Sequence, residues 1–295
     1  MATRPPAAQT AFGPMVIAAA ERYVPAPRRV VDDELAIRFL PAAARAVVGA
    51  CRWRPARDWL AGVTDKRAPG IWGGVLCRKR YADDAVRESL HDGIGQLVVL
   101  GAGLDTRAYR LAAPAGVPSF EIDLSANIDY KRRRVTALYG RVPEHVTLVP
   151  VDLGRDDLAA ALGAAGVRDD RPTMFVWEAV TQYLTEAAVR ATLAAVSTAA
   201  PGSRLIFTYV RKDFLDGTSP YGAERLRRDF VVRRRVWHFG IDPGAVAGLL
   251  REHGWDQREQ VGTAEYRARY LEPAGRDLPV SEIERFVLAV KAQNS

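Results

Sequence analysis

The fold of this chain is decided by the stretch Gln96-Leu97-Val98-Val99-Leu100-Gly101-Ala102-Gly103-Leu104-Asp105-Thr106-Arg107. A short apolar run typical of a buried strand ends in Gly-x-Gly and is followed at once by a segment that can be helical. An α/β protein presents a cofactor in this way, at the carboxyl end of its first parallel strand. Gly101 and Gly103 can adopt backbone angles closed to other residues, and they leave room for a ligand against the main chain.

Apolar runs and helical segments alternate beyond this stretch. Strands are predicted at Leu97–Leu100, Ser119–Asp123, Val146–Val151, Thr173–Trp177 and Arg204–Val210, with two closing candidates at Gln257–Val261 and Arg285–Lys291. Because five strand–helix units in series require a parallel sheet with helices on both faces, we expect an α/β fold. The closing strands complete a seven-stranded sheet whose last pair is antiparallel. Among the connecting helices, one is expected from about Asp105 to Leu111 and another over Asp156–Ala165.

Two parts of the chain fall outside this alternation. Residues 1–92 are mostly helical in pattern, with prolines as punctuation, and we predict that they form a helical cap on a domain of residues 93–295. Residues 211–241 lie between the fifth strand and a helix start at Asp242-Pro243, and the sheet does not need them. We expect this insertion to lie over the carboxyl edge of the sheet as a lid. Cap and lid together would close a pocket there.

The charge balance is moderately basic. Forty-two Lys and Arg face 35 Asp and Glu, a formal net charge of +7, with arginine concentrated at 131–134 and 225–235. No basic stretch is interleaved with aromatic residues in a nucleic-acid module, so we ascribe the excess to solvated helix faces and expect no nucleic-acid partner.

Three functional classes find no support in the sequence. No apolar run approaches the roughly 20 residues needed to span a bilayer, so no membrane association is expected. Cys51 and Cys77 are too few for a disulfide framework, and their spacing indicates no metal site. Met1–Ala20 lacks the pattern of a signal peptide, which leaves a cytoplasmic location as the expectation.

Carboxylates stand at the ends of the second and third predicted strands. Glu121 and Asp123 lie 20 and 22 positions beyond Gly101, where a carboxylate can accept hydrogen bonds from a ribose diol. Asp152 and Leu153 come at the end of the third strand, where an adenine amino group could donate to the acid while its ring packs on the leucine. Each acid taken alone could equally be the N-cap of the next helix.

The residue at position 106 discriminates between cofactors. The dinucleotide fingerprint has a third glycine that lets the helix N-terminus approach a pyrophosphate, but Thr106 stands there. A cofactor without phosphates is therefore favoured, and S-adenosylmethionine fits the acids at three strand ends. A nicotinamide-dependent oxidoreductase is the nearest enzymatic alternative, and a non-catalytic protein that binds S-adenosylmethionine or a partner is the nearest non-enzymatic one. The sequence contains no Gly-x-Ser-x-Gly motif, which a serine hydrolase would need. It also has no motif that holds a flipped base, which disfavours a nucleic-acid methyltransferase.

The glycine stretch also resembles a known family. Gly101-Ala102-Gly103-Leu104-Asp105-Thr106-Arg107-Ala108-Tyr109-Arg110-Leu111 is similar to the signature "GAGLDTRAxRL" of leucine carboxyl methyltransferase-like proteins, and most of all to their actinobacterial branch of S-adenosylmethionine-dependent O-methyltransferases. Further matches fall in order over residues 10–290: Thr10-Ala11, Ala18–Arg22 and Val31–Ala36, then Arg78–Asp84, Phe120–Asp123 and Trp177–Leu184. The branch includes polyketide methyltransferases, so the resemblance implies O-methylation of a small molecule, with polyketide-type metabolites among the candidates.

The resemblance implies a class I methyltransferase fold with a helical cap, and it assigns the cofactor site. Arg78 would bind the cofactor carboxylate, Gly101 and Gly103 with the neighbouring Asp105 would form the methionine turn, and Asp123, with Glu121, would bind the ribose. Asp152 and Leu153 would hold the adenine, and Glu178 would lie near the cofactor amino group. The chain departs from the family pattern at Lys79, Ala179, Thr181 and Gln182.

The methyl acceptor stays open between two chemistries. Transfer from a sulfonium is an in-line displacement, so catalysis is mostly the positioning of an oxygen about 3 Å from the methyl carbon. A carboxylate is already ionised, whereas a hydroxyl benefits from a base by roughly 10²–10⁴-fold. Candidates for a base or for substrate orientation are Glu178, Tyr183, Tyr209 and His238. The tyrosines could instead be pocket walls, and His238 could be a packed lid residue.

Overall fold

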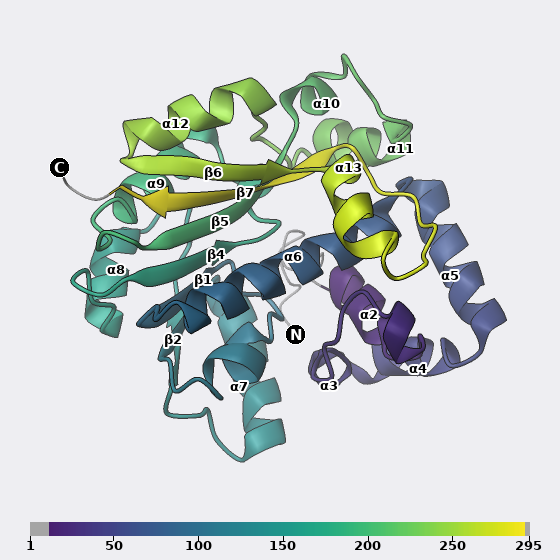
Figure 1. Ribbon diagram of the computed structural model, residues 1–295, viewed down its shortest axis with the longest axis horizontal. Helices are drawn as coiled ribbons and strands as arrows, with labels where there is room; N and C mark the ends of the chain where they lie inside the picture. Colours follow the sequence, from purple (N-terminus) through teal and green to yellow (C-terminus); the bar gives the residue numbers. More distant parts are fainter. Residues whose placement is uncertain (1–11, 293–295) are drawn as a thin grey trace.

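The computed structural model describes residues 12–292, and at its centre lies a seven-stranded sheet in the order β3-β2-β1-β4-β5-β7-β6 (Figure 1). The strands are β1 (Gln96–Leu100), β2 (Ser119–Asp123), β3 (Val146–Pro150), β4 (Thr173–Trp177), β5 (Arg204–Val210), β6 (Trp255–Val261) and β7 (Glu284–Lys291). β1 to β5 pair in parallel, while β7 is antiparallel to both β5 and β6. Chain order reverses between β1 and β4, and open α/β sheets bind their ligands outside the carboxyl ends of such strands.

The predicted α/β fold is confirmed, including seven strands and an antiparallel last pair. The predicted bounds of β2, β4 and β5 are those observed. β6 begins at Trp255, two residues before its predicted start. An irregularity between Gln257 and Glu259 shifts the register of this strand, which interrupts the regular alternation of its side chains.

The helix expected at Asp105–Leu111 is present but starts later, as the short π-helix η2 (Ala108–Ala112). The Asp105 N–H donates to the Ala102 carbonyl oxygen at 2.7 Å, and the Asp105 carboxylate accepts from the Arg107 N–H at 2.7 Å. The glycine turn therefore extends through residue 105 and delays helical geometry. α8 (Leu158–Ala165) likewise starts later than predicted, because the Asp157 carboxylate caps it by accepting from the Ala160 N–H.

Each face of the sheet has its own core, and β1 contributes alternate residues to both. Val98 and Leu100 pack toward α8, α9 (Glu186–Ala195) and α12 (Val246–Glu252). The short turns η3 (Thr181–Tyr183) and η5 (Pro243–Ala245) contact β5 and α12. Leu97 and Val99 pack toward α6 (Ile71–His91), α7 (Ser125–Tyr139) and the cap. Because the central strands are buried on both faces, nearly all of their residues are apolar, as their sequences indicated.

The predicted cap, residues 1–92, includes the long α6 and, on one side of the sheet, short helices: α2 (Phe12–Glu21), η1 (Ala26–Arg28), α3 (Ala36–Phe39), α4 (Ala42–Ala50) and α5 (Arg54–Arg67) (Figure 1). Met15 and Phe39 of the cap belong to the same buried cluster as Met174 and Phe286 of the sheet. The cap therefore has no separate core in the described part of the chain. The Thr10-Ala11 pair of the family pattern lies outside the described residues.

The predicted insertion at 211–241 carries three short elements, α10 (Lys212–Asp216), α11 (Glu224–Arg227) and η4 (Arg228–Arg233). Its base is closed: Arg211 pairs with Ile241, and the Ile241 N–H donates to the Val210 carbonyl oxygen at 3.2 Å. Phe214 and Ala223 form a small cluster with Val210 and Ile283. The chain thus leaves the sheet and returns to it at one point.

A second insertion was not predicted. Residues 262–283, between β6 and β7, carry α13 (Thr263–Tyr266) and η6 (Arg267–Leu271) and lie against α6 (Figure 1). The Ser281 N–H donates to the Gly70 carbonyl oxygen at 3.0 Å, and a Cβ on Gly73 would lie 2.3 Å from the Pro279 carbonyl oxygen. The Arg276 guanidinium pairs with the buried Glu21 carboxylate of α2 at 2.8 Å. This segment therefore joins the cap to the sheet.

No helix within residues 12–292 combines the length and the apolar character required to cross a bilayer.

The close approach at Gly73 gives a test of this fold. We expect Gly73→Ala to lower the free energy of unfolding by about 1–3 kcal/mol, because its methyl group would force the backbone of the 262–283 segment away from α6. Gly74→Ala is the matched control, since the nearest atom to a Cβ there is 3.7 Å away. The control should be neutral or stabilising by up to about 1 kcal/mol, as for Gly→Ala inside a helix. Urea denaturation measures both, and equal effects would contradict the close packing.

Candidate active site

A cavity of about 480 Å³ opens at the carboxyl edge of the sheet, beside the switch point. Its walls come from the turn after β1, from the ends of β2, β3 and β4, from α2, α5 and α6 of the N-terminal half, from the lid and from the end of the 262–283 segment. The volume lies within the range of small-molecule sites. Residues of the N-terminal helices and of the 211–241 insertion thus line the cavity over this edge.

The glycine turn forms the floor of the cavity. Gly101 and Gly103 both have positive φ, +69° and +45°, where residues with a side chain are strained. A Cβ on Gly101 would also lie 2.3 Å from a methyl group of Val180. The Gly103 N–H donates to the Asp123 carboxylate at 2.6 Å, which holds the turn against the end of β2.

The structure separates the two acids expected at the ribose. Asp123 lines the cavity, and its other oxygen accepts from the Leu124 N–H at 2.7 Å and from the Asn127 side chain at 2.8 Å. Glu121 is fully buried below the cavity, paired with Lys131 at 2.5 Å and with the Tyr109 hydroxyl at 2.8 Å. It lies two residues, about 6–7 Å, back from the end of the strand, where helices cover the sheet.

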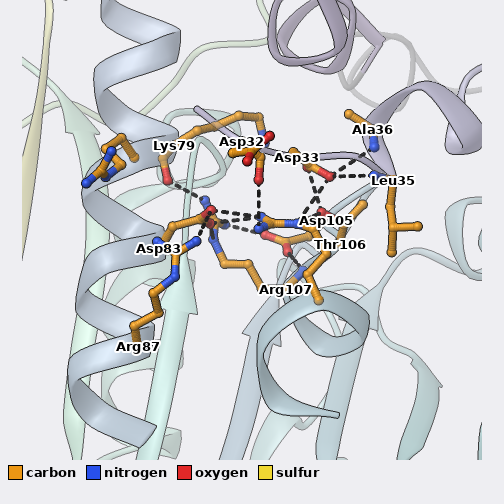
Figure 2. Close-up of polar contacts among 12 residues, drawn as sticks. Asp32, Asp33, Leu35, Ala36, Lys79, Asp83, Arg87, Asp105, Thr106 and Arg107 are labelled. Carbon is orange, nitrogen blue, oxygen red and sulfur yellow. Dashed lines mark hydrogen bonds and ion pairs between the residues drawn. The ribbon is translucent and has the colours of Figure 1, made fainter. Parts of the chain in front are cut away.

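A buried arginine joins the elements around the turn (Figure 2). Arg107 is 2% exposed. Its Nε donates to Asp83 of α6 at 2.7 Å, and its Nη2 donates to the Lys79 carbonyl oxygen at 3.2 Å. Its Nη1 pairs with Asp105 of the turn and, at 2.8 Å, with Glu178 after β4. One guanidinium thus holds α6, the glycine turn and the end of β4 at fixed distances from one another.

This network continues into the cap through Thr106. The Thr106 hydroxyl donates to the Asp33 carboxylate at 2.7 Å, and the other oxygen of Asp33 accepts from the Ala36 N–H at 2.9 Å (Figure 2). Arg110 pairs with Asp33 at 3.1 Å and with Asp83 at 2.9 Å. The residue in place of the third glycine therefore forms a contact between the N-terminal helices and the sheet.

Arg78 and Lys79 are the cations of the cavity wall among the described residues. Arg78 is buried, and it donates from Nε to Glu178 at 2.8 Å and from Nη1 to Glu284 at 2.6 Å. The Lys79 ammonium makes no ion pair within residues 12–292, although it lies close enough to Asp105 and Glu178 to lower the pKa of both. Lys79 is thus the lining cation that has no carboxylate within ion-pair distance in the described chain.

Glu178 stays ionised. Burial alone would raise the pKa of this carboxyl, but Arg107, Lys79 and Arg78 outweigh burial and hold the pKa far below its usual range. A carboxylate of such low proton affinity is a poor general base at neutral pH. The position of the Glu178 carboxylate near the glycine turn suits it to orient a bound positive group and to stabilise its charge.

The other predicted residues divide into two groups. Asp105, Asp152, Leu153 and Tyr183 line the cavity, whereas Tyr209 and His238 do not. Tyr209 is fully buried and hydrogen-bonded to Gln260, and His238 is exposed. The neighbours of these two residues, Val210 and Trp237, line the cavity instead. Successive side chains of an extended segment point to opposite sides, so a predicted site residue that is wrong by one position has its side chain outside the cavity.

Sequence reasoning missed several wall residues: Asn127, Phe230, Trp237, Tyr266 and Glu284. Phe230 and Trp237 stand seven positions apart in an arginine-rich segment, and this aromatic pair was the available signal. Tyr266 lies within the 262–283 segment and Glu284 directly follows it, and this segment carried no recognisable pattern. Within residues 12–292, no cluster of His, Cys, Asp and Glu is suited to hold a metal ion.

The fold is that of the class I methyltransferases. Two solved structures share the fold. A provisionally named methyltransferase from Thermobifida fusca has a TM-score of 0.60 at 19% identity over 84% of this chain and 92% of its own. A DUF574 family protein from Streptomyces avermitilis has a TM-score of 0.57 at 16% identity over 80% and 91%.

The family is established by the sequence comparison. Residues 11–197 match the leucine carboxyl methyltransferase family, and the chain belongs to this family. Its relatives include proteins provisionally named S-adenosyl-L-methionine-dependent methyltransferases. That of Mycobacterium tuberculosis is 34% identical over 205 residues, and that of Mycolicibacterium smegmatis is 34% identical over 207. The match spans 66% of this chain and 66% of the first relative, and 67% and 65% for the second. The resemblance seen in the motifs is thereby confirmed.

The buried guanidinium gives a second test. We expect Arg107→Met to lower the free energy of unfolding by about 3–5 kcal/mol, because it leaves Asp83, Asp105 and Glu178 buried without their shared cation. Arg87→Met is the matched control, since Arg87 is 46% exposed and lies 3.6 Å from the same Asp83. Arg87→Met should change the free energy of unfolding by no more than about 1 kcal/mol. Thermal or urea denaturation separates the two, and a small effect of Arg107→Met would show that the network is not structural.

Proposed function

We propose that this methyltransferase uses S-adenosylmethionine to methylate an oxygen atom of a small molecule. The observation that carries the proposal is the order of groups around one cavity. The glycine turn, Asp123, and the pair Asp152 and Leu153 line it in the sequence of β1, β2 and β3. This order matches the methionine, ribose and adenine parts of an extended nucleoside cofactor.

The residues at the turn fit a cofactor without phosphates. η2 has five residues and the Thr106 hydroxyl donates to Asp33, so the glycine turn is not followed by a long helix whose N-terminus could bind a pyrophosphate. The positive charge of Arg107 is matched by three carboxylates. These features favour a sulfonium cofactor over a nicotinamide dinucleotide.

Each part of the cofactor has a proposed partner. Asp123 accepts from the ribose diol, and Leu153 packs on the adenine while Asp152 accepts from its amino group. Arg78 and Lys79 supply positive charge for the methionine carboxylate, with Lys79 free of competing ion pairs in the described chain. Glu178 and Asp105 supply negative charge for the amino group, since both carboxyls have lowered pKa values despite burial.

Bound S-adenosylmethionine supplies an electrophilic methyl group on a sulfonium. The residues of this chain then act by position: the turn and its acids fix the cofactor, and the lid and cap hold the methyl acceptor in line and exclude water. Glu178 orients and does not take the proton. Tyr183 lines the cavity and is a candidate to orient the acceptor. Polyketide-type metabolites are the first compounds to test as acceptors, because of the family branch that the motifs resemble.

Cofactor identity is tested by calorimetry. We expect S-adenosylhomocysteine to bind and NAD not to bind. Asp123→Ala should weaken binding by about 1–3 kcal/mol, the loss expected for hydrogen bonds to a charged group. Asp129→Ala is the control, since Asp129 is exposed on the adjoining α7. Binding of NAD alone would overturn the proposal, and equal affinity of a folded Asp123→Ala variant would remove the ribose assignment.

The product is tested with cofactor labelled in its methyl group. We expect label to pass from the cofactor into the small-molecule fraction of actinobacterial metabolite extracts, and not into nucleic acid. Treatment with base then classifies the product, because methyl esters release labelled methanol and aryl ethers do not. A protein that binds S-adenosylhomocysteine but labels nothing would favour the alternative of a non-catalytic binding protein.

A further inference from the structure

One residue of the cavity wall lies in a backbone conformation that its side chain disfavours. Ala179, the second residue after β4, lines the cavity and has a φ of +60°. Two other non-glycine residues of the described chain have positive φ, Tyr221 and Arg235, and both belong to the 211–241 insertion. The left-handed region is unfavourable for a residue with a Cβ, and it persists only where the surroundings impose it. An interaction outside Ala179 itself therefore holds it in this conformation.

That interaction comes from Thr208 of β5. The pairing of β4 with β5 ends at Trp177 and Phe207, so Thr208 is the first residue of β5 beyond it. Its hydroxyl oxygen accepts from the Ala179 N–H at 2.7 Å, and its carbonyl oxygen accepts from the Thr181 hydroxyl at 2.7 Å. Thr208 and Thr181 are both fully buried. One threonine thus ties the segment after β4 to β5 at two points, on either side of residue 180.

The residues on either side of Ala179 define the site. Glu178 forms ion pairs with both buried arginines of the site, at 2.8 Å each. Val180 lies against the glycine turn, since a Cβ on Gly101 would be 2.3 Å from one of its methyl groups. A change in the φ of Ala179 would rotate one of these flanking residues relative to the other. The left-handed conformation of Ala179 therefore sets where the Glu178 carboxylate and the Val180 side chain lie relative to each other.

We infer that Thr208 is a positioning residue of the methyltransferase site. Its hydroxyl acts through Ala179: the hydrogen bond offsets the strain of the positive φ and so keeps the Glu178 carboxylate in place. Thr208 is not among the residues that line the cavity, so its effect on a ligand is indirect. This inference rests on the proposed function, in which Glu178 faces the amino group of the cofactor, and it adds the group that holds that carboxylate in position.

The test uses two ligands that differ in the part that Glu178 would contact. S-adenosylhomocysteine carries the amino-acid part of the cofactor, whereas methylthioadenosine has the same adenosine and sulfur without it. Thr208→Val keeps the shape of the side chain and leaves the Ala179 N–H without its partner. Calorimetry should show S-adenosylhomocysteine binding weakened by about tenfold, a factor within the strain of one such residue. Methylthioadenosine binding should change by less than about threefold, because that ligand does not reach Glu178.

Three further variants separate positioning from a general loss of stability. Thr208→Ser retains a hydroxyl and should retain the affinity for S-adenosylhomocysteine. Thr192→Val removes another buried hydroxyl, one that donates within α9 to the Ala188 carbonyl oxygen at 2.9 Å, and it should change neither affinity. Ala179→Gly removes the strain, because glycine adopts positive φ freely. In an Ala179→Gly background, Thr208→Val should therefore weaken S-adenosylhomocysteine binding by less than about threefold.

The outcomes separate this inference from the proposed function. Failure of the wild-type protein to bind S-adenosylhomocysteine would overturn the proposed function itself. Given such binding, an unchanged affinity in folded Thr208→Val, or an equal loss for both ligands, would overturn the inference. An equal effect of Thr208→Val with and without Ala179→Gly would show that Thr208 does not act through Ala179.

Near-ultraviolet circular dichroism establishes that each variant is folded. If Thr208→Val does not fold, Thr208→Ala removes the same hydroxyl with less bulk. It should show the same selective loss of S-adenosylhomocysteine binding, and an equal loss for both ligands would again contradict a positioning role.

Discussion

The buried guanidinium of Arg107 is the interaction on which the arrangement of the site depends. Its three carboxylate partners come from α6, from the glycine turn and from the end of β4, positions as far apart in the chain as 83 and 178. Burying one such charge is unfavourable unless every partner is in place. The turn therefore cannot shift relative to α6 or β4 without exposing or isolating a charge, so the cavity floor is held rigidly.

The same principle governs the chemistry of the cavity. Carboxylates and cations are interleaved so closely that Glu178 and Asp105 remain ionised despite burial, and Arg78 is held between two acids. Groups fixed in one protonation state can orient a cofactor and stabilise its charges, but they do not exchange protons readily. Such a site is suited to methyl transfer, in which positioning contributes most of the catalysis.

Much of the fold was predictable because its signals are local. The central strands are apolar on both faces, and turn and capping residues separate them from the helices, so their bounds could be read to within a residue or two. Two features were not predictable for physical reasons. The helix after the glycine turn starts late because the Asp105 N–H is bonded within that turn to the Ala102 carbonyl oxygen, and the 262–283 segment is ordered by contacts with α2 and α6 that no local pattern records.

By itself, the sequence determined the order of strands along the chain, the glycine turn, the acids at the strand ends and the family. These depend on periodicity and on residues adjacent in the chain. Only the tertiary structure decided that Asp123 and not Glu121 reaches the cavity, that Trp237 and not His238 forms its wall, and that Glu284 neutralises Arg78. The reason is that side-chain direction and charge pairing depend on residues brought together from distant positions. Arg78 and Glu284, for example, stand 206 positions apart.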